Sequence, residues 1–420
     1  MSTVDRVTGA APFVVVGSSL AGLRAVEAAR QVGYSGEIVL IGTEHHLPYD
    51  RPPLSKKLLE KGSSDGRVTP PHFRDAGYVQ DGLQVTVRSG VPAVALDTDG
   101  RCVILADGSA VRYGCLVIAT GARPRQPFDS AGQLSGVHDF RVHEDSQAVR
   151  AGLERGARVA IIGAGLIGSE VASSARTWDA EVTLVEAQEV PLVRALGATV
   201  GSAVADLHEE NGVRLLLGAC VASLEGVGAV EAIRLDVGTR IASDLVVTAI
   251  GVDPETDWLR GSGLQLDNGI VCDANLWTGV PGVFAAGDVV SWPNGQFGRQ
   301  RLETWTSAAE QGAVAAKNAL DPATARAYTT TPYFWSDWYG NRLQFVGSPV
   351  ADEVQWIEGG VGQGRRAVAL YRRADRCVGA FALNAPGETM KLRALVGRGT
   401  SWPEAIVFAE SRARSYLARQ

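Results

Sequence analysis

The stretch RVAIIGAGLIGSEVASSARTWDAEVTLVEA, residues 158–187, contains the pattern that decides the fold. An apolar run ends at Gly163, a glycine-rich turn and a helical pattern follow, and a second apolar run ends at Glu186. In such a pattern the first glycine makes the tight turn, and the second lets the backbone approach a pyrophosphate. The third, here Gly168, lets helix pack on strand. The helix N-terminus offers N–H groups to phosphates, and the acid suits a ribose diol. The stretch therefore predicts a dinucleotide-binding unit.

A second copy of this pattern begins 146 residues earlier, in FVVVGSSLAGLRAVEAARQVG. Gly17 and Gly22 take the first and third glycine positions, whereas Ser19 replaces the middle glycine. The acid Glu44 closes the next apolar run, 22 residues after Gly22. Serine is small, so the backbone stays accessible, although this match is weaker. Because both copies carry their acid, the sequence predicts two Rossmann-like dinucleotide sites.

Several further segments carry a family resemblance. TGARPR and GVFAAGDVVSW resemble the segments that complete an FAD site in two-dinucleotide flavoprotein reductases. With PYDRPPLSK, IIGAGLIGSEVA, RLETWTSAAEQG and PYFWSDWYG, the chain resembles the NADH-dependent ferredoxin reductases that serve bacterial Rieske dioxygenases and cytochrome P450 systems. This resemblance runs through nearly the whole chain. It implies FAD at the first copy, NADH at the second, and an acceptor that is a [2Fe–2S] ferredoxin, with the oxygenase or cytochrome P450 served indirectly.

The fold class that follows is α/β, with two Rossmann-like domains and a C-terminal α/β domain. The chain from about residue 330 changes to short aromatic-rich strands and then to helical patterns. We expect an FAD domain in two segments, 9–120 and 245–326, an NADH domain at 121–244, and a C-terminal domain at 327–420.

The resemblance also implies which residues contact each dinucleotide. The implied FAD contacts are Gly17, Ser19, Ala21, Gly22, Glu44, Arg51, Lys56, Ala93, Arg123, Asp288 and Trp305. The implied NADH contacts are Gly163, Gly165, Leu166, Ile167, Gly168 and Glu186. NADH is favoured over NADPH because the Glu186 carboxylate would repel a 2′-phosphate. Simple core packing stays open as an alternative for Trp305.

Two residues are candidates for the chemistry. Lys56 ends the proline-rich stretch PYDRPPLSK, and the resemblance places it beside the flavin. Glu170 resembles the glutamate that pairs with the loop lysine in related disulfide reductases, which predicts a Lys56–Glu170 ion pair; a helix-surface glutamate is the alternative. Disulfide reductases carry a cysteine pair after this loop, and NADH oxidases and peroxidases carry one cysteine where Lys56 stands. The loop therefore argues against thiol chemistry, and we expect no metal site.

Composition limits the other classes of function. The net charge of −6 argues against a general nucleic-acid binder. No apolar run reaches the roughly 18 residues that cross a membrane. The five cysteines are scattered without a CxxC pair, and the N-terminal residues do not resemble a signal peptide, so we expect the cytoplasm.

The expected partner has a counterpart in the charge pattern. A ferredoxin is acidic, so the reductase should present a basic face. Residues 361–420 carry 11 Lys and Arg against 4 Asp and Glu. Candidates for that face, which an ordinary solvated surface could equally explain, are Arg365, Arg366, Arg372, Arg373, Lys391, Arg393 and Arg398.

Two other functions stay open on the same scaffold. One is a rubredoxin reductase or another NADH:acceptor reductase. The other is an NADH-sensing flavoprotein that acts through partner binding, as in apoptosis-inducing factors.

Overall fold

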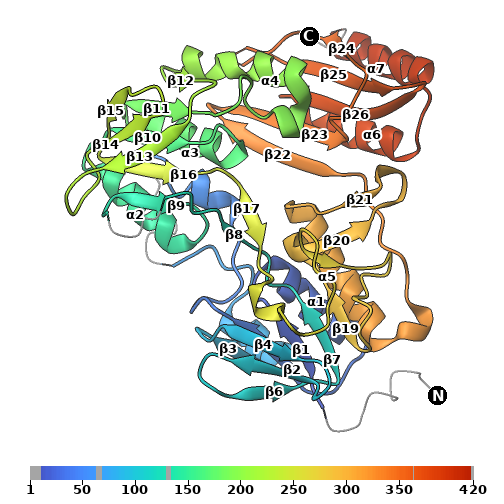
Figure 1. Cartoon of the computed structure of the whole chain (residues 1–420). Coiled ribbons are helices and arrows are strands. Elements are labelled where there is room, and N and C mark those ends of the chain that lie inside the picture. The colour runs from blue at the N-terminus through green and yellow to red at the C-terminus, as the bar shows by residue number, and fades with distance from the viewer. Residues whose placement is uncertain (1–10, 63–68, 129–133, 363, 418–420) are drawn as a thin grey trace. The chain divides into compact units, whose positions relative to one another are not determined.

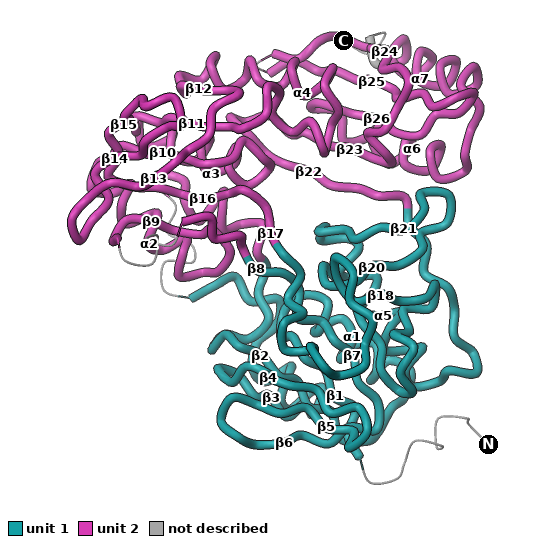
Figure 2. Tube along the Cα trace, viewed as in Figure 1, with its two compact units in different colours: residues 1–50, 69–123, 253–330 teal, residues 51–68, 124–252, 331–420 magenta. Residues whose placement is uncertain are grey.

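The structure is a computed structural model that describes residues 11–62, 69–128, 134–362 and 364–417. Figure 1 shows the elements along the chain. Contacts between Cα atoms divide the chain into two compact units, coloured separately in Figure 2. Unit 1 comprises residues 1–50, 69–123 and 253–330, and unit 2 comprises residues 51–68, 124–252 and 331–420. Two of the boundaries between the units fall within β8 (Ala122–Pro124) and β17 (Val252–Pro254), and the others follow residues 50, 68 and 330.

Unit 1 is built on a five-stranded parallel sheet. Its strands, in spatial order, are β19 (Val283–Ala285), β7 (Cys115–Ile118), β1 (Phe13–Val16), β2 (Ile38–Gly42) and β3 (Val85–Ser89). Two helices belong to the same unit, α1 (Leu20–Gln31) and α5 (Trp305–Leu320). Smaller sheets are formed by β4 (Ala93–Asp97), β5 (Cys102–Leu105) and β6 (Ala110–Arg112), and by β18 (Ile270–Val271), β20 (Val290–Pro293) and β21 (Arg299–Gln300).

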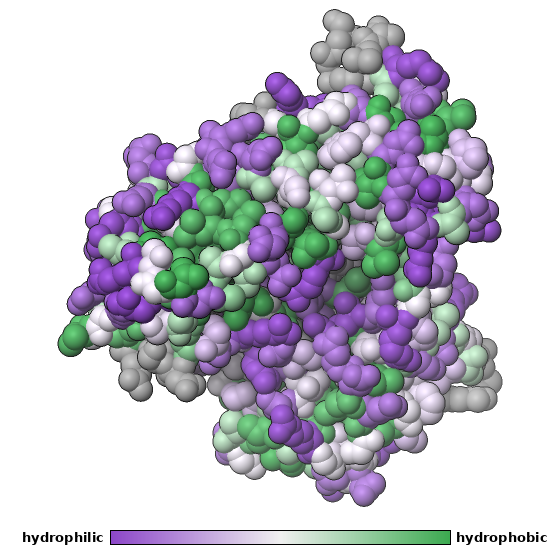
Figure 3. Space-filling view, turned by 45° about the horizontal axis from the view of Figure 1, so that its top comes forward, coloured by the Kyte–Doolittle hydropathy of each residue, from purple (hydrophilic) through white to green (hydrophobic). Residues whose placement is uncertain are grey.

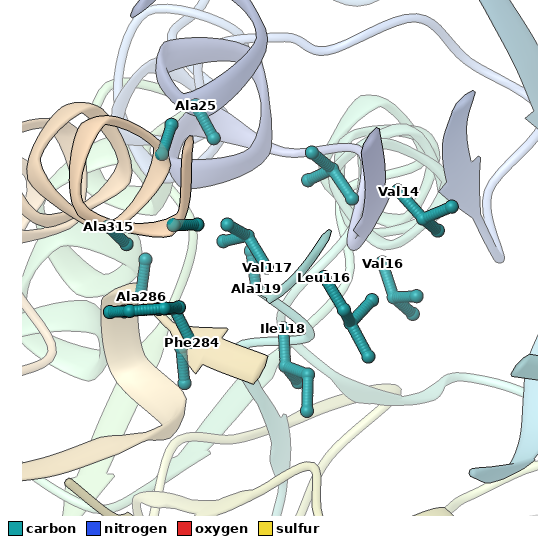
Figure 4. Packing of buried hydrophobic residues seen from close by; sticks show 14 of the residues in the cluster. Val14, Val16, Ala25, Leu116, Val117, Ile118, Ala119, Phe284, Ala286 and Ala315 are labelled. Atoms are coloured by element: carbon teal, nitrogen blue, oxygen red, sulfur yellow. The ribbon is translucent and has the colours of Figure 1, made fainter. Parts of the chain in front are cut away.

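The core of unit 1 consists of apolar strands covered by small helix residues. Every residue of β1 is buried, as expected for a parallel strand with both faces covered. Ala25 of α1 and Ala315 of α5 lie in the same buried cluster as Val117 of β7 and Phe284 of β19 (Figure 4). Alanine at these positions lets the helices approach the sheet closely.

Unit 2 contains a second five-stranded parallel sheet. Its spatial order is β12 (Arg214–Leu216), β11 (Val182–Val185), β10 (Val159–Ile162), β16 (Leu245–Thr248) and β9 (Val137–Asp139). The accompanying helices are α2 (His143–Glu154), α3 (Leu166–Arg176) and α4 (Val193–Glu210), and β13 (Val221–Glu225), β14 (Ala232–Leu235) and β15 (Arg240–Ala242) form a small antiparallel sheet. Both predicted strand–turn–helix–strand units are thus present, β1–α1–β2 and β10–α3–β11, and the α/β class is confirmed.

The C-terminal part of unit 2 is an antiparallel sheet. Its spatial order is β22 (Tyr333–Trp338), β23 (Asn341–Gly347), β26 (Arg376–Leu383), β25 (Ala367–Arg373) and β24 (Glu353–Glu358), and α6 (Pro386–Gly397) and α7 (Trp402–Leu417) follow. This sheet shares a hydrophobic core with α4, and the Tyr371 hydroxyl donates a hydrogen bond to the carbonyl oxygen of Leu196. The aromatic strands expected after residue 330 are therefore confirmed.

The outer surface carries many polar residues. Hydrophilic side chains are spread between smaller apolar areas on the face drawn in Figure 3. Within the described part of the chain, no helix is both long enough and apolar enough to span a membrane. The described residues also contain no cluster of His, Cys, Asp and Glu that could hold a metal ion.

Candidate dinucleotide sites and the Lys56–Glu170 pair

The first glycine-rich loop joins β1 to α1 in unit 1. Gly17 has φ +118°, a backbone conformation that favours glycine, and a Cβ atom there would collide with the carbonyl oxygen of Ala119. A Cβ atom at Gly22 would collide with the carbonyl oxygen of Gly17. Gly17 is thus required by the close approach of the turn to the chain just after β7, and Gly22 by the packing of α1 on that turn. Ser19 occupies the N-cap of α1 in an extended conformation.

Glu44 follows β2, at the same end of the sheet. Its carboxylate accepts a hydrogen bond from the buried hydroxyl group of Tyr49. Its backbone carbonyl accepts the N–H of Gly90 at 3.1 Å, which brings the segment before β4 next to the acid. Ala93, the first residue of β4, lies three residues further along and is half-buried. These contacts bring the predicted ribose acid and the region of Ala93 together.

The turn that contains Asp288 packs against the start of α1. Gly287 has φ +82°, and a Cβ atom there would lie 3.1 Å from the Cβ atom of Ala21. The N–H of Gly287 donates to the side-chain oxygen of Gln311 on α5 at 2.8 Å. Asp288 itself is half-buried in the single-turn helix that follows. The structure therefore brings Ala21 and Asp288 to the same end of the sheet as the first glycine loop.

Trp305 and Arg123 complete the unit 1 set of predicted FAD contacts. Trp305 begins α5, and its indole N–H donates to Asp50 at 2.9 Å. Arg123 forms ion pairs with Glu255, at 2.9 Å, and with Asp257. The guanidinium of Arg123 lowers the pKa of the Asp257 carboxyl group. The structure thus holds Trp305 through a polar contact and not only through apolar packing.

The second glycine-rich loop joins β10 to α3 in unit 2. Gly163 has φ +103°, and a Cβ atom there would lie 2.5 Å from the carbonyl oxygen of Ala249. A Cβ atom at Gly168 would collide with the carbonyl oxygen of Gly163. A Cβ atom at Gly165 would lie 3.8 Å from the carbonyl oxygen of Ala249. Apart from its chain neighbours and its own helix, this is the nearest atom of the described chain. The chain therefore leaves room at Gly165, as a pyrophosphate on the α3 N-terminus requires.

Glu186 stands one residue after β11 and faces this loop. Its carboxylate accepts the N–H of Ala164 at 2.9 Å and the N–H of Gln188 at 3.0 Å. Leu166 and Ile167 are the first two residues of α3, and 42% of the surface of Ile167 is exposed. The geometry of the glycine loop, the helix N-terminus and the acid fits a nicotinamide dinucleotide.

Lys56 and Glu170 form an ion pair within unit 2. The distance from Lys56 Nζ to Glu170 Oε2 is 2.6 Å, and the two side chains are 16% and 3% exposed. Pro52 and Pro53 begin a 3₁₀ turn, Pro52–Ser55, that ends just before the lysine. Proline fixes φ near −65°, which suits the first positions of a helical turn. The proline-rich stretch thus positions the Lys56 ammonium group beside the buried Glu170 carboxylate.

The Glu170 carboxylate also accepts hydrogen bonds from two hydroxyl groups that the sequence analysis does not predict. Ser55 donates to Glu170 Oε2 and Ser336, on β22, donates to Oε1. Arg51, at the N-cap of the turn, donates to the carbonyl oxygen of Arg141 at 2.8 Å. Ser55 lies inside the quoted proline-rich loop, directly before Lys56, and this position is a local signal for its contact. Ser336 lies 166 residues from Glu170, and no local signal connects the two.

The basic candidates for partner docking differ in their surroundings. Several have acidic neighbours, in the pairs Arg366–Glu358 and Arg372–Glu353 at 2.7 Å and Lys391–Glu388 at 3.8 Å. Arg393 lies over the ring of Tyr333, 5.6 Å from its centroid. Arg365, Arg373 and Arg398 are exposed, and no acid of the described chain lies within ion-pair distance of them.

Family models match nearly the whole chain. The pyridine nucleotide-disulphide oxidoreductase family matches residues 11–312, and the reductase C-terminal family matches residues 333–413. The biphenyl dioxygenase system ferredoxin–NAD(+) reductase component of Paraburkholderia xenovorans is 36% identical over 391 residues, which cover 93% of this chain and 94% of the relative. The benzene 1,2-dioxygenase system ferredoxin–NAD(+) reductase subunit of Pseudomonas putida is 35% identical, with 89% of each chain covered.

Solved structures give the same result. The ferredoxin reductase for the CYP199A2 system from Rhodopseudomonas palustris has a TM-score of 0.87 and 32% identity, over 93% of this chain and 96% of that one. Putidaredoxin reductase, in its covalent complex with putidaredoxin, has a TM-score of 0.86 and 30% identity, over 93% and 94%. The chain therefore belongs to the pyridine nucleotide-disulphide oxidoreductase family.

Proposed function

We propose that this chain is an FAD-dependent reductase that takes electrons from NADH and passes them singly to a [2Fe–2S] ferredoxin of an oxygenase or cytochrome P450 system. The relatives named as ferredoxin–NAD(+) reductase components and the reductase–putidaredoxin complex support this assignment. FAD, when bound, supplies the exchange between a two-electron hydride donor and a one-electron acceptor. The domain ranges 9–120 with 245–326, 121–244 and 327–420 stay part of the proposal.

The chain's own residues would bind and orient the two dinucleotides. In unit 1, the N-terminus of α1, Glu44 and Asp288 would hold FAD. In unit 2, the N-terminus of α3 would bind the pyrophosphate of NADH, and Glu186 would accept hydrogen bonds from the ribose and disfavour a 2′-phosphate. Glu170 would hold the Lys56 ammonium in place, and that positive charge would stabilise negative charge on a reduced cofactor.

The observation that carries the proposal is the identity of the group in the proline-rich loop. The loop presents Lys56, paired with Glu170, where thiol-dependent relatives are expected to carry a cysteine. The five cysteines of the chain, all in its described part, are free. Electrons therefore have no thiol acceptor in this loop, which favours delivery to an external partner. Free thiols also fit a reducing compartment, and we propose the cytoplasm.

Ferredoxin reduction tests the proposal directly. The FAD-loaded protein is assayed for NADH-driven cytochrome c reduction, alone and with a panel of [2Fe–2S] ferredoxins and rubredoxins. We expect a ferredoxin to raise the rate well above the background. Stimulation by rubredoxin alone would transfer the assignment to rubredoxin reductases. If no acceptor stimulates, and the reduced flavin persists as a complex with NAD⁺, an NADH-sensing role is supported instead.

Added salt tests how the partner docks. Screening weakens attraction between exposed charges, so ferredoxin-dependent turnover should fall steeply with ionic strength while dye reduction by NADH stays flat. Replacing Arg365, Arg373 and Arg398 with glutamine should weaken the salt dependence more than replacing Arg366 and Arg372, which already have acidic neighbours. Equal effects of the two sets would contradict docking through the exposed arginines.

The Lys56–Glu170 pair gives a prediction of its own. Replacing Glu170 with alanine leaves the ammonium without its carboxylate, and we expect flavin reduction by NADH to slow about tenfold or more. The measurement is stopped-flow absorbance at saturating NADH. Glu189→Ala, which removes an exposed carboxylate from the same unit, is the matched control. An unchanged rate in the Glu170 variant would remove the pair from the mechanism.

A further inference from the structure

The Glu170 carboxylate is connected to an indole group through a single serine. Ser336 and Trp338 are both fully buried, at 0% exposure. Trp338 Nε1 donates to Ser336 Oγ at 2.7 Å, and Ser336 in turn contacts Glu170 Oε1. An indole N–H can only donate, and a serine hydroxyl has one hydrogen atom. Because the serine oxygen accepts from Trp338, its hydrogen is directed to the carboxylate.

One of the two Glu170 carboxylate oxygens accepts its hydrogen bond from the Ser336 hydroxyl group. Ser55 and Lys56 both contact Oε2, whereas Ser336 serves Oε1. A buried ion pair is stable only when hydrogen bonds satisfy its remaining lone pairs. Lys56 also has a second acceptor, the carbonyl oxygen of Pro52 at 3.2 Å. Loss of the Ser336 hydroxyl would therefore loosen Glu170 and release Lys56 toward its own turn.

The ring of Trp338 is stacked against a histidine ring. The ring of His208, on α4, stacks on Trp338 with centroids 5.2 Å apart and planes at 30°. Its Nε2 lies 3.2 Å from Ser169 Oγ and its Nδ1 lies 2.8 Å from the Tyr339 hydroxyl. Burial lowers the pKa of His208 to about 4, so the ring is neutral near pH 7 and adds no charge beside the ion pair.

These contacts and the backbone of α3 together form a closed loop. Ser169, which contacts His208, is the residue before Glu170 on α3. The path runs from Glu170 through Ser336, Trp338 and His208 back to Ser169, and it joins α3, β22 and α4 within unit 2. Such a loop fixes each member through two neighbours, so the carboxylate has little freedom to turn.

We propose that Ser336 is a positioning residue for the Lys56–Glu170 pair, and that Trp338, backed by His208, sets the direction of the Ser336 hydroxyl. The inference goes beyond the proposed function, and it rests on that function only for the place of the pair beside the flavin. Strand β22 of the C-terminal sheet would then contribute to hydride transfer through Glu170.

The first test measures the indole group itself. The protein is labelled with ¹⁵N at the indole nitrogens, and its nine tryptophans give at most nine signals. Trp338→Phe assigns the Trp338 signal by its loss. In Ser336→Ala we expect that signal to shift and its N–H to exchange with water about tenfold faster, because a hydrogen bond worth roughly 1.4 kcal/mol is lost. In Glu170→Gln, which keeps the shape, the signal should also shift.

The second test measures flavin reduction by NADH in stopped flow. Ser336→Ala should slow the limiting rate about tenfold while the NADH dissociation constant changes less than about twofold. Trp338→Phe keeps the ring stacked on His208 but removes the N–H, and should slow the rate less, by about threefold. The matched control is Ser243→Ala, a buried serine of the same unit whose hydroxyl donates only to the Ile241 carbonyl, at 3.2 Å, in the described chain.

The outcomes separate this inference from the proposed function. If the Trp338 indole signal does not shift in Ser336→Ala or in Glu170→Gln, the hydrogen-bond network from Trp338 through Ser336 to Glu170 is overturned. Equal flavin-reduction rates in Ser336→Ala and Ser243→Ala overturn the positioning role, because any buried hydroxyl would then serve. Neither measurement contains a ferredoxin, so failure of ferredoxin reduction would overturn the proposed function and leave both of these results unchanged.

Discussion

The two glycine-rich loops, residues 17–22 and 163–168, share one requirement and differ in another. In both, the first glycine has a positive φ, and a side chain at the third would collide with the carbonyl oxygen of the first. The first position is set by the close approach of the turn to the chain just after a neighbouring strand, and the third by the packing of the helix on the turn. The middle position differs, because one loop has Ser19 and the other has Gly165, where a Cβ atom would have 3.8 Å of room. Packing therefore does not require a glycine at position 165, and we expect this glycine to serve the ligand.

The acids that serve the two loops are also held differently. Glu186 accepts N–H groups from Ala164, inside its own loop, and from Gln188. Glu44 is held by the side chain of Tyr49. Backbone N–H groups thus help to hold Glu186, and a replaceable side chain helps to hold Glu44. The comparison leads to four predictions, which separate what the fold requires from what the ligand requires.

The largest effect is expected at the third glycines. Gly168→Ala and Gly22→Ala would each force a methyl group onto a backbone carbonyl, which cannot move without displacing the helix. We expect each to lower the free energy of unfolding by about 3 kcal/mol, at the upper end of overpacking effects. Thermal unfolding of the FAD-loaded protein measures this. Gly165→Ala is the control within the same loop, and equal destabilisation by Gly165→Ala would remove the distinction between fold and ligand positions.

Gly165→Ala should instead act on NADH. The methyl group fits the protein but would occupy the space where we expect the pyrophosphate to approach the backbone. We expect unfolding to change by less than about 0.5 kcal/mol. The apparent NADH dissociation constant should rise more than about tenfold. It is measured from the dependence of the flavin-reduction rate on NADH concentration in stopped flow. FAD content is the internal control, because it depends on the other loop. Unchanged NADH affinity would mean that the cofactor does not approach this turn.

These comparisons show what a sequence can and cannot predict. Both strand–turn–helix–strand units, their acids and the aromatic C-terminal strands follow from local patterns, because each depends on residues close together in the chain. The proline-rich loop and Glu170 were connected through the family resemblance. Ser336 and Trp338 were not connected to Glu170, since their contact depends on how β22 packs on α3, 166 residues away in the sequence. The charge count over residues 361–420 likewise leaves out Glu358 and Glu353 of β24, which pair with Arg366, just before β25, and with Arg372 of β25.

A smaller effect is expected from the NADH-side acid. Glu186→Gln keeps an oxygen for the Ala164 N–H but removes the charge that would bind the ribose and repel a 2′-phosphate. Hydrogen bonds to charged groups contribute about 1.5–3 kcal/mol, so the KM for NADH should rise about tenfold and the preference over NADPH should narrow. Steady-state dye reduction with both nucleotides measures this. Glu189→Gln, at an exposed acid three residues on, should change neither value, and a similar change in both variants would point to general charge instead of Glu186.

The smallest effect is expected at Tyr49, where the direction of the change in the FAD dissociation constant decides between two roles of the hydroxyl group. Tyr49→Phe removes the hydroxyl that orients Glu44 but keeps the buried ring. If the hydroxyl positions the carboxylate for the ribose, the FAD dissociation constant should rise about fivefold, since an ordinary hydrogen bond contributes about 1 kcal/mol. If it competes with the ribose for the same oxygens, the constant should fall. Reconstitution of the deflavinated protein with FAD measures the constant, and Tyr78→Phe, at an exposed tyrosine of the same unit, is the control. We expect weaker binding, because the Tyr49 hydroxyl is a side-chain donor that helps to hold the Glu44 carboxylate. Tighter binding would show that the two acids meet their ribose groups by different means.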